Sequence, residues 1–110
     1  MAYDEDLAAR MRTLVAGEPG LSEKKMFGGL AFLVGGNMAV AASGQGGALV
    51  RVDPAESETL VRTSSARLME MRGRELPGWL RLESADLASD EELATWVERG
   101  VSFARSLPAK

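Results

Sequence analysis

The glycine-rich stretches of the sequence are the first candidates for chemistry, because glycine-rich loops can cradle phosphate groups. Phe27-Gly28-Gly29 and Gly35-Gly36-Asn37 follow each other closely in the chain. Neither has the Gly-x-Gly-x-x-Gly order, and no Gly-Lys-Ser/Thr element opens a following helix. Glycine is also the residue that adopts a positive φ at the lowest cost. We therefore interpret both stretches as turns or bulges.

Basic side chains are a second group, which could bind an anion or a nucleic acid. Alternation along the predicted strands places some of them on the sheet face that points away from the core. A solvated sheet face with interspersed charges accounts for this pattern. Nucleic-acid binding stays as an alternative, although the net charge of −3 and the shortage of aromatic residues disfavour it. The candidates are Lys24, Lys25, Arg51, Arg72, Arg74 and Arg81.

Acidic residues are concentrated where the C-terminal helix is predicted to begin, and carboxylates are the usual ligands of hard metal ions. Their order does not match a calcium-binding loop. Negative charge also stabilises the start of a helix, which explains the cluster without a ligand. We therefore predict no metal site. The cluster consists of Glu83, Asp86, Asp90, Glu91 and Glu92.

Two residue types that carry much of enzyme chemistry are absent, since the sequence has no His and no Cys. Without them there is no thiol nucleophile, no zinc knuckle and no imidazole to act as a general base near neutral pH. We therefore predict that the protein is not an enzyme, with no catalytic residues and no cofactor. The alternative is a small-ligand or catalytic pocket near Phe27, Gly28 and Trp79 that uses carboxylates, Lys or Arg.

The apolar segments 30–34 and 38–42 predict a surface for protein contact, because they are apolar on both alternating faces. One face can pack on the helices. The other is larger than a monomer with helices on one side needs. Such patches commonly mark interfaces, unless an overhanging loop or helix covers them. We expect self-association as a homodimer, or binding of another regulatory protein. The interaction candidates are Lys25, Met26, Phe27, Gly28, Gly29, Phe32, Arg51 and Trp79.

The first half of the chain must supply a helix and a run of strands to position these residues. Apolar residues at helical spacing (Leu7, Met11, Leu14, Val15) predict a helix over residues 4–16, with Asp4 as its N-cap. The glycine pair at 28–29 suggests a bulge or a close approach of another segment. Strands are predicted over residues 21–27, 30–34, 38–42 and 48–52, with Val50 and Val52 facing the core.

The second half is predicted to return to helices, with two strands between them. Asp53 and Pro54 have the order of an N-cap and a first helical position, and Ser89 starts a capping box before the last helix. The predicted elements are a helix over 54–62, a strand over 68–72, a loop over 73–78, a strand over 79–82, a 3₁₀ turn over 86–88 and a helix from 89 to 107.

Length and composition indicate one soluble domain, residues 1–110, with 45% hydrophobic and 26% charged residues. Strands in an uninterrupted run with helices outside them favour an α+β fold. We expect a two-layer sandwich, in which an antiparallel sheet of five to six strands carries helices from the N-terminus, the middle and the C-terminus. No apolar run approaches a membrane span, and the acidic N-terminus lacks signal-peptide features, so we expect a cytoplasmic protein without membrane contact.

Three ordered motifs resemble the N-terminal domain of the TfoX/Sxy competence-regulator family. The first is Met26-Phe27-Gly28-Gly29, followed by an apolar strand, the glycine–Asn turn and Met38. The second is Leu49-Val50-Arg51-Val52-Asp53, in which Arg51 stands where family members often have Lys. The third is Leu76-Pro77-Gly78-Trp79 with the closing helix.

This resemblance implies a secretion-chaperone-like α+β fold in a cytoplasmic bacterial protein, and it brings no catalytic residues. It also implies a link to the regulation of natural transformation, in which such proteins are thought to assist a transcription activator. The full-length regulators carry a second domain resembling helix-hairpin-helix nucleic-acid binders, for which this sequence shows no counterpart. We therefore expect a stand-alone N-terminal domain.

Overall fold

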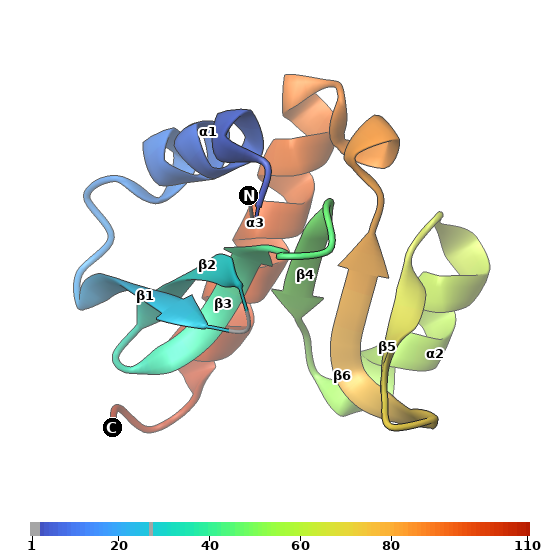
Figure 1. Cartoon of the computed structure of the whole chain (residues 1–110). Coiled ribbons are helices and arrows are strands. Elements are labelled where there is room, and N and C mark those ends of the chain that lie inside the picture. The colour runs from blue at the N-terminus through green and yellow to red at the C-terminus, as the bar shows by residue number, and fades with distance from the viewer. Residues whose placement is uncertain (1–2, 27) are drawn as a thin grey trace.

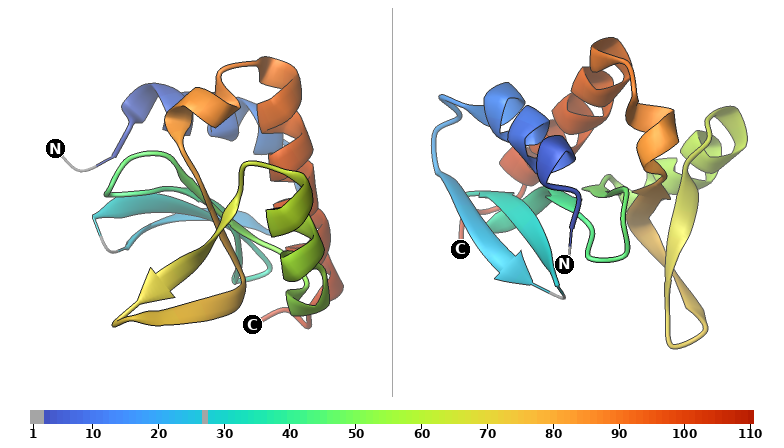
Figure 2. Two further views of the ribbon diagram at one scale, coloured as in Figure 1. Left: turned by 90° about the vertical axis from the view of Figure 1, so that its right-hand side faces the viewer. Right: turned by 45° about the horizontal axis from the view of Figure 1, so that its top comes forward.

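A six-stranded antiparallel sheet forms one layer of the molecule, and three α-helices pack against one of its faces in the other layer (Figures 1 and 2). The computed structural model describes residues 3–26 and 28–110, and it confirms the predicted α+β sandwich. Its elements are α1 (Glu5–Val15), β1 (Leu21–Met26), β2 (Gly29–Val34), β3 (Asn37–Ala42), β4 (Ala48–Arg51), α2 (Pro54–Thr63), β5 (Arg67–Met71), β6 (Arg74–Leu82), the 3₁₀ helix η1 (Ser84–Leu87) and α3 (Asp90–Ser106).

The three α-helices begin where their capping residues predict. Asp4, Asp53 and Ser89 each accept a hydrogen bond from a backbone N–H in the first turn of the helix that follows, at 2.9–3.0 Å. These bonds satisfy donors that have no partner within the helix. Pro54 occupies the first turn of α2, where its missing N–H costs nothing.

The sheet has the strand order β1-β2-β3-β4-β6-β5, with every neighbouring pair antiparallel. The β2–β3 hairpin turns through Gly35 and Gly36, whose φ angles of 60° and 84° require residues that tolerate the left-handed region. β6 pairs with β4 although α2 and β5 lie between them in the sequence. As a result β1 and β5 are the two edge strands.

The bulge predicted at the glycine pair lies elsewhere. Gly28 is in the turn that precedes β2, and Gly29 begins that strand. A Cβ on Gly29 would collide with the Ala42 carbonyl oxygen, which confirms the alternative prediction of a close approach. The register of β2 shifts instead between Phe32 and Leu33. Phe27, placed in the first strand by the sequence, lies outside the described residues.

The predicted loop over 73–78 is wrong, because β6 runs without interruption from Arg74 to Leu82. The turn is instead the pair Arg72-Gly73, with φ angles of 56° and 78°. Pro77 is tolerated within the strand because the pairing with β5 jumps from Leu76 to Leu80. On the other side β4 pairs only as far as Trp79, so the missing N–H of Pro77 interrupts no ladder hydrogen bond.

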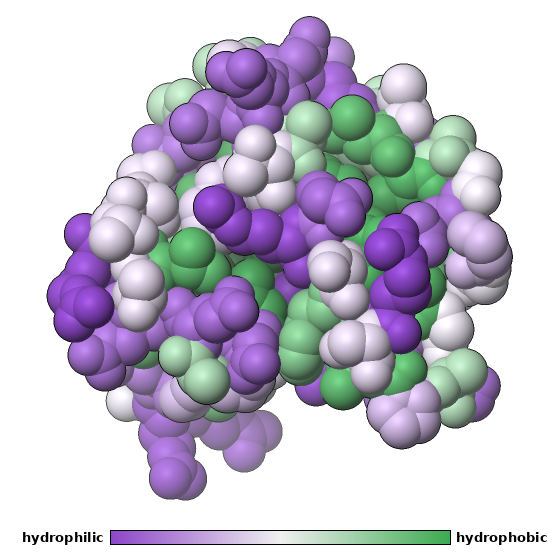
Figure 3. All heavy atoms as spheres, turned by 180° about the vertical axis from the view of Figure 1, so that it is seen from behind, coloured by the Kyte–Doolittle hydropathy of each residue, from purple (hydrophilic) through white to green (hydrophobic). Residues whose placement is uncertain are grey.

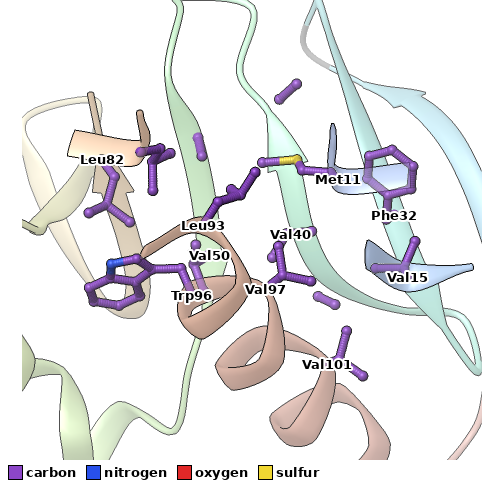
Figure 4. Close-up of a cluster of buried hydrophobic side chains, with 14 of the residues drawn as sticks. Met11, Val15, Phe32, Val40, Val50, Leu82, Leu93, Trp96, Val97 and Val101 are labelled. Atoms are coloured by element: carbon purple, nitrogen blue, oxygen red, sulfur yellow. The ribbon is translucent and has the colours of Figure 1, made fainter. Parts of the chain in front are cut away.

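The core lies between the sheet and the helices, where Phe32 of β2 is completely buried beneath α1 and α3 (Figure 4). Leu7, Met11 and Val15 of α1 are buried as predicted, whereas Leu14 is 42% exposed at the margin of the apolar stripe. α3 approaches β3 closely because Gly100 has no Cβ to collide with the Ala39 carbonyl. The remaining large, fully buried side chains are Leu80, Leu82, Leu87, Leu93, Val40 and Val50.

Two bidentate ion pairs join elements on the helix side of the sheet. Arg12 of α1 donates to Glu23 of β1 at 2.7 and 3.1 Å, and Arg105 of α3 donates to Glu18 at 3.0 and 2.8 Å. These hydrogen bonds lower the pKa of both carboxyl groups below the ordinary value of 4.5. Each pair therefore stabilises the fold fully above that value, and its contribution is lost as the pH falls through the folded-state pKa.

Acidification is expected to destabilise the wild-type protein more than a Glu18→Gln/Glu23→Gln variant, because the variant has no carboxylates to protonate at these positions. Urea unfolding at about pH 6 and about pH 3 measures the difference. The control is Glu58→Gln, which removes a longer ion pair (3.4 Å) to Arg62 within α2. Its stability should depend on pH as that of the wild type does. Equal acid sensitivity of the double variant and the wild type would contradict the assignment.

Candidate binding groove on the second sheet face

The sheet face that points away from the helices has its own apolar cluster, as the alternation of β2 and β3 predicts. Ala31, Met38 and Ala41 are at most 8% exposed, although none of the three helices covers them. Met26, Leu33, Leu49 and Trp79 pack around these three as partly buried neighbours. By contrast, hydrophilic side chains make up much of the helix side of the molecule (Figure 3).

A groove of about 840 Å³ lies over this cluster. The β5–β6 hairpin forms one of its walls and contributes Met69, Met71 and Leu76. Four of the six methionines in the sequence thus line one surface: Met26 and Met38 from β1 and β3, with the two from β5. Methionine is unbranched and polarisable, so a surface rich in it can adapt to apolar partners of different shape. We call this surface the methionine groove.

The charged side chains of the methionine groove are mostly positive, in a chain whose net charge is −3. They are the guanidinium groups of Arg51, Arg72 and Arg81 and the ammonium group of Lys110, against the single carboxylate side chain of Glu70. None of the three arginines forms a salt bridge with another residue in the described part of the chain. The groove therefore combines an apolar floor with basic groups that no internal carboxylate neutralises.

Arg51 is held by two aromatic rings. Its guanidinium carbon lies 4.9 Å from the centroid of the Trp79 ring and 5.5 Å from that of Phe103 in α3. Cation–π attraction favours this arrangement and restricts the side chain. Within residues 3–26 and 28–110 the guanidinium has no hydrogen-bond acceptor, so its N–H donors face solvent at the groove.

Arg81, an anion-binding candidate from the sequence, has a structural role. Its guanidinium donates to Ser43 Oγ at 3.0 Å and to the carbonyl oxygens of Gln45 and Gly46 at 3.3 and 2.8 Å. These bonds hold the β3–β4 loop against β6. Since both Nη atoms already donate to this loop, Arg81 offers a ligand fewer free N–H groups than Arg51 does, although it still contributes positive charge to the groove.

The structure brings four of the sequence-predicted interaction candidates to the methionine groove: Met26, Gly29, Arg51 and Trp79. Phe32 is not among them, because it faces the helices in the core. The remaining candidates lie elsewhere or outside the description: Lys25 is exposed on edge strand β1 on the helix side, Gly28 is exposed in the turn before β2, and Phe27 lies outside the described residues.

Apart from Trp79, the groove residues of β5 and β6 were not predicted from the sequence. The alternation that puts Met69 and Met71 on one face is visible in the sequence. Their proximity to Met26 and Met38 depends on the strand order, which places the β5–β6 hairpin beside β4. The full length of β6 was not predicted, because Pro77 in the sequence favoured a loop over residues 73–78.

The acidic cluster near α3 is explained by capping and ion pairs. Asp86 accepts from the Glu83 N–H at 3.2 Å, Glu83 pairs with Arg67 at 2.6 Å, and Asp90 pairs with Arg10 at 3.1 Å. Across the described residues no group of three or more Asp, Glu, His or Cys could hold a metal ion. No helix in the same part of the chain is long and apolar enough to cross a membrane.

A comparison with protein families matches the chain to the TfoX N-terminal domain over residues 13–104. The chain belongs to the TfoX N-terminal domain family. The match begins within α1 and ends within α3, so it spans every strand that builds the methionine groove. It confirms the resemblance of the sequence motifs. A search of curated proteins finds no significant match to this TfoX N-terminal domain.

Proposed function

We propose that this TfoX N-terminal domain is a non-enzymatic regulatory module that binds another protein in the methionine groove. The observation that supports this most is the set of partly buried apolar side chains that no helix covers on this sheet face: Met26, Leu33, Leu49 and Trp79. An apolar surface of this kind is costly to leave in water and commonly marks an interface. Membership of the family supports a competence-regulator-like domain, and regulation through a partner protein is consistent with that membership.

The composition of the groove also favours a protein over a nucleic acid. Single-stranded nucleic acids bind to basic grooves in which several aromatic rings stack on bases. Here Trp79 is the one aromatic residue among the described lining, and its ring already stacks with Arg51. The floor between the arginines consists of methionine, leucine and alanine. Such a floor suits apolar side chains better than bases or phosphates.

The homodimer that we expect from the sequence stays a prediction. We propose that its interface lies outside the groove. In a symmetric dimer the same surface meets itself, so two hollowed floors would enclose a void. The edge strands β1 and β5 carry unpaired backbone groups and offer a better contact. Light scattering at high protein concentration tests self-association, and a strict monomer would contradict it without affecting the groove.

Selection of peptides from an unbiased display library tests the proposed function. Peptides enriched on the wild-type domain are expected to bind a Leu49→Glu variant at least about tenfold more weakly, because the new carboxylate is placed on the apolar floor. Leu14→Glu makes the same chemical change at an exposed position of α1, and it should leave binding unchanged. Circular dichroism and thermal unfolding check that both variants are folded.

Two results would count against the proposal. One is a library that yields no peptide specific for the folded domain. The other is a set of peptides that bind the wild type, Leu49→Glu and Leu14→Glu equally, since these would recognise a surface outside the methionine groove.

A further inference from the structure

The floor of the methionine groove offers no backbone hydrogen bonds to a ligand. Ala31, Ala41 and Leu49 each pair with residues of the strands on both sides, so the N–H and C=O groups along this row are used within the sheet. A peptide that lies on this face must therefore satisfy its own backbone groups, because leaving them unpaired against an apolar floor is costly. An α-helix does so internally, whereas an extended segment does not. The geometry thus selects a helical occupant.

Arg51 sets the charge of that occupant. Stacking on Trp79 and Phe103 fixes the guanidinium, while its donors have no acceptor elsewhere in residues 3–26 and 28–110. A guanidinium presents a planar fork of N–H groups that matches a carboxylate in a bidentate pair. Arg72 and Arg81 add positive charge along the same surface. Carboxylates beside the apolar side chains of the partner complement this pattern.

We propose that the methionine groove binds an acidic, amphipathic α-helix of a partner protein. Apolar side chains at i, i+3/i+4 and i+7 of that helix contact the floor, and a Glu or Asp beside them pairs with Arg51. The inference rests on the proposed function and names the class of partner. Affinity falls with rising salt, since the pair with Arg51 lies at a partly exposed rim.

Designed peptides provide the test, with fluorescence anisotropy as the readout. The first probe is a helical peptide of about 18 residues with one leucine stripe and glutamates beside it. The second has glutamine in place of every glutamate. The third has the composition of the first in an order that destroys the stripe. We expect the first peptide to bind the wild-type domain at least about tenfold more tightly than the second. The third peptide should bind neither the wild type nor the variants.

The substitution Arg51→Gln is expected to weaken binding of the glutamate peptide about tenfold and to leave the glutamine peptide unchanged. Arg51→Lys keeps the charge but not the planar fork, and it should give an intermediate loss. Arg99→Gln is the matched control. Arg99 also stacks on a tryptophan, 4.5 Å from the Trp96 ring, but it lies in α3 outside the groove, so its removal should change neither affinity.

The inference and the proposed function fail in different ways. If the glutamate and glutamine peptides bind equally well and Leu49→Glu abolishes both, the groove is a docking site but the acidic character is wrong. If only extended or proline-containing peptides from the display library occupy the groove, the helical occupant is wrong. Equal losses of affinity with Arg51→Gln and Arg99→Gln would mean that the effect comes from net charge alone. That result would overturn the role of Arg51. An oligonucleotide that displaces the glutamate peptide would also overturn the inference.

Discussion

Replacing Phe32 by alanine is expected to lower the free energy of unfolding by about 3–5 kcal/mol, the usual cost of truncating a buried aromatic ring. Phe32 is 0% exposed and lies in the main core cluster between β2 and the helices. The loss combines the transfer of apolar surface with the cavity left behind. A domain of this size has a total stability of about 5–15 kcal/mol, so the variant should be close to unfolding.

Chemical denaturation of Phe32→Ala measures this loss, with Leu14→Ala as the control. Leu14 is 42% exposed on the helix side, and its truncation should change the stability by about 0.5 kcal/mol or less. A Phe32→Ala variant that keeps wild-type stability but loses partner binding would contradict the structure. That outcome would place Phe32 on the interaction surface, as predicted from the sequence.

Replacing Gly47 by alanine is expected to destabilise the domain by about 2–5 kcal/mol, through two separate effects. Gly47 has a φ of 70°, and an L-residue in this region costs about 1–2 kcal/mol. A Cβ at this position would also collide with the carbonyl oxygen of Leu82, at the end of β6. Overpacking against backbone that cannot move costs roughly another 1–3 kcal/mol.

Gly46→Ala separates the two effects. Gly46 has a similar φ of 89°, yet nothing lies within 4 Å of the Cβ that alanine would add. This variant should therefore be destabilised only by the cost of an L-residue at positive φ, about 1–2 kcal/mol. Unfolding curves for the two variants should differ by the cost of the collision. Equal losses would mean that the β3–β4 loop moves away from β6 at no cost, in spite of the hydrogen bonds from Arg81.

One sheet serves two purposes in this fold, and the division follows from the alternation of its strands. Phe32 and Val40 turn toward the helices and stabilise the core, while Ala31 and Ala41 turn away and form the floor of the groove. Small alanine side chains keep that floor low, and the methionines around it supply the contact area. Substitutions on one face should therefore alter stability, and those on the other should alter binding.

Local features of this chain were determined by the sequence, because each depends on neighbours only a few residues away. Asp4, Asp53 and Ser89 cap the helices as predicted, since a cap bonds to the N–H groups of its own first turn. The turn at Gly35-Gly36 follows from the preference of glycine for positive φ. The apolar character of both faces of residues 30–34 and 38–42 was visible from alternation alone.

The tertiary structure alone decided which faces and strands meet. Pairing of β6 with β4 brings Met69 and Met71 into the same groove as Met26 and Met38, and no local pattern encodes contacts between segments so far apart. The same pairing carries Trp79 next to Arg51, where Phe103 of α3 completes the stack. Two-residue periodicity shows that a strand has two faces but not which of them the helices cover. That choice depends on the summed burial of the whole core.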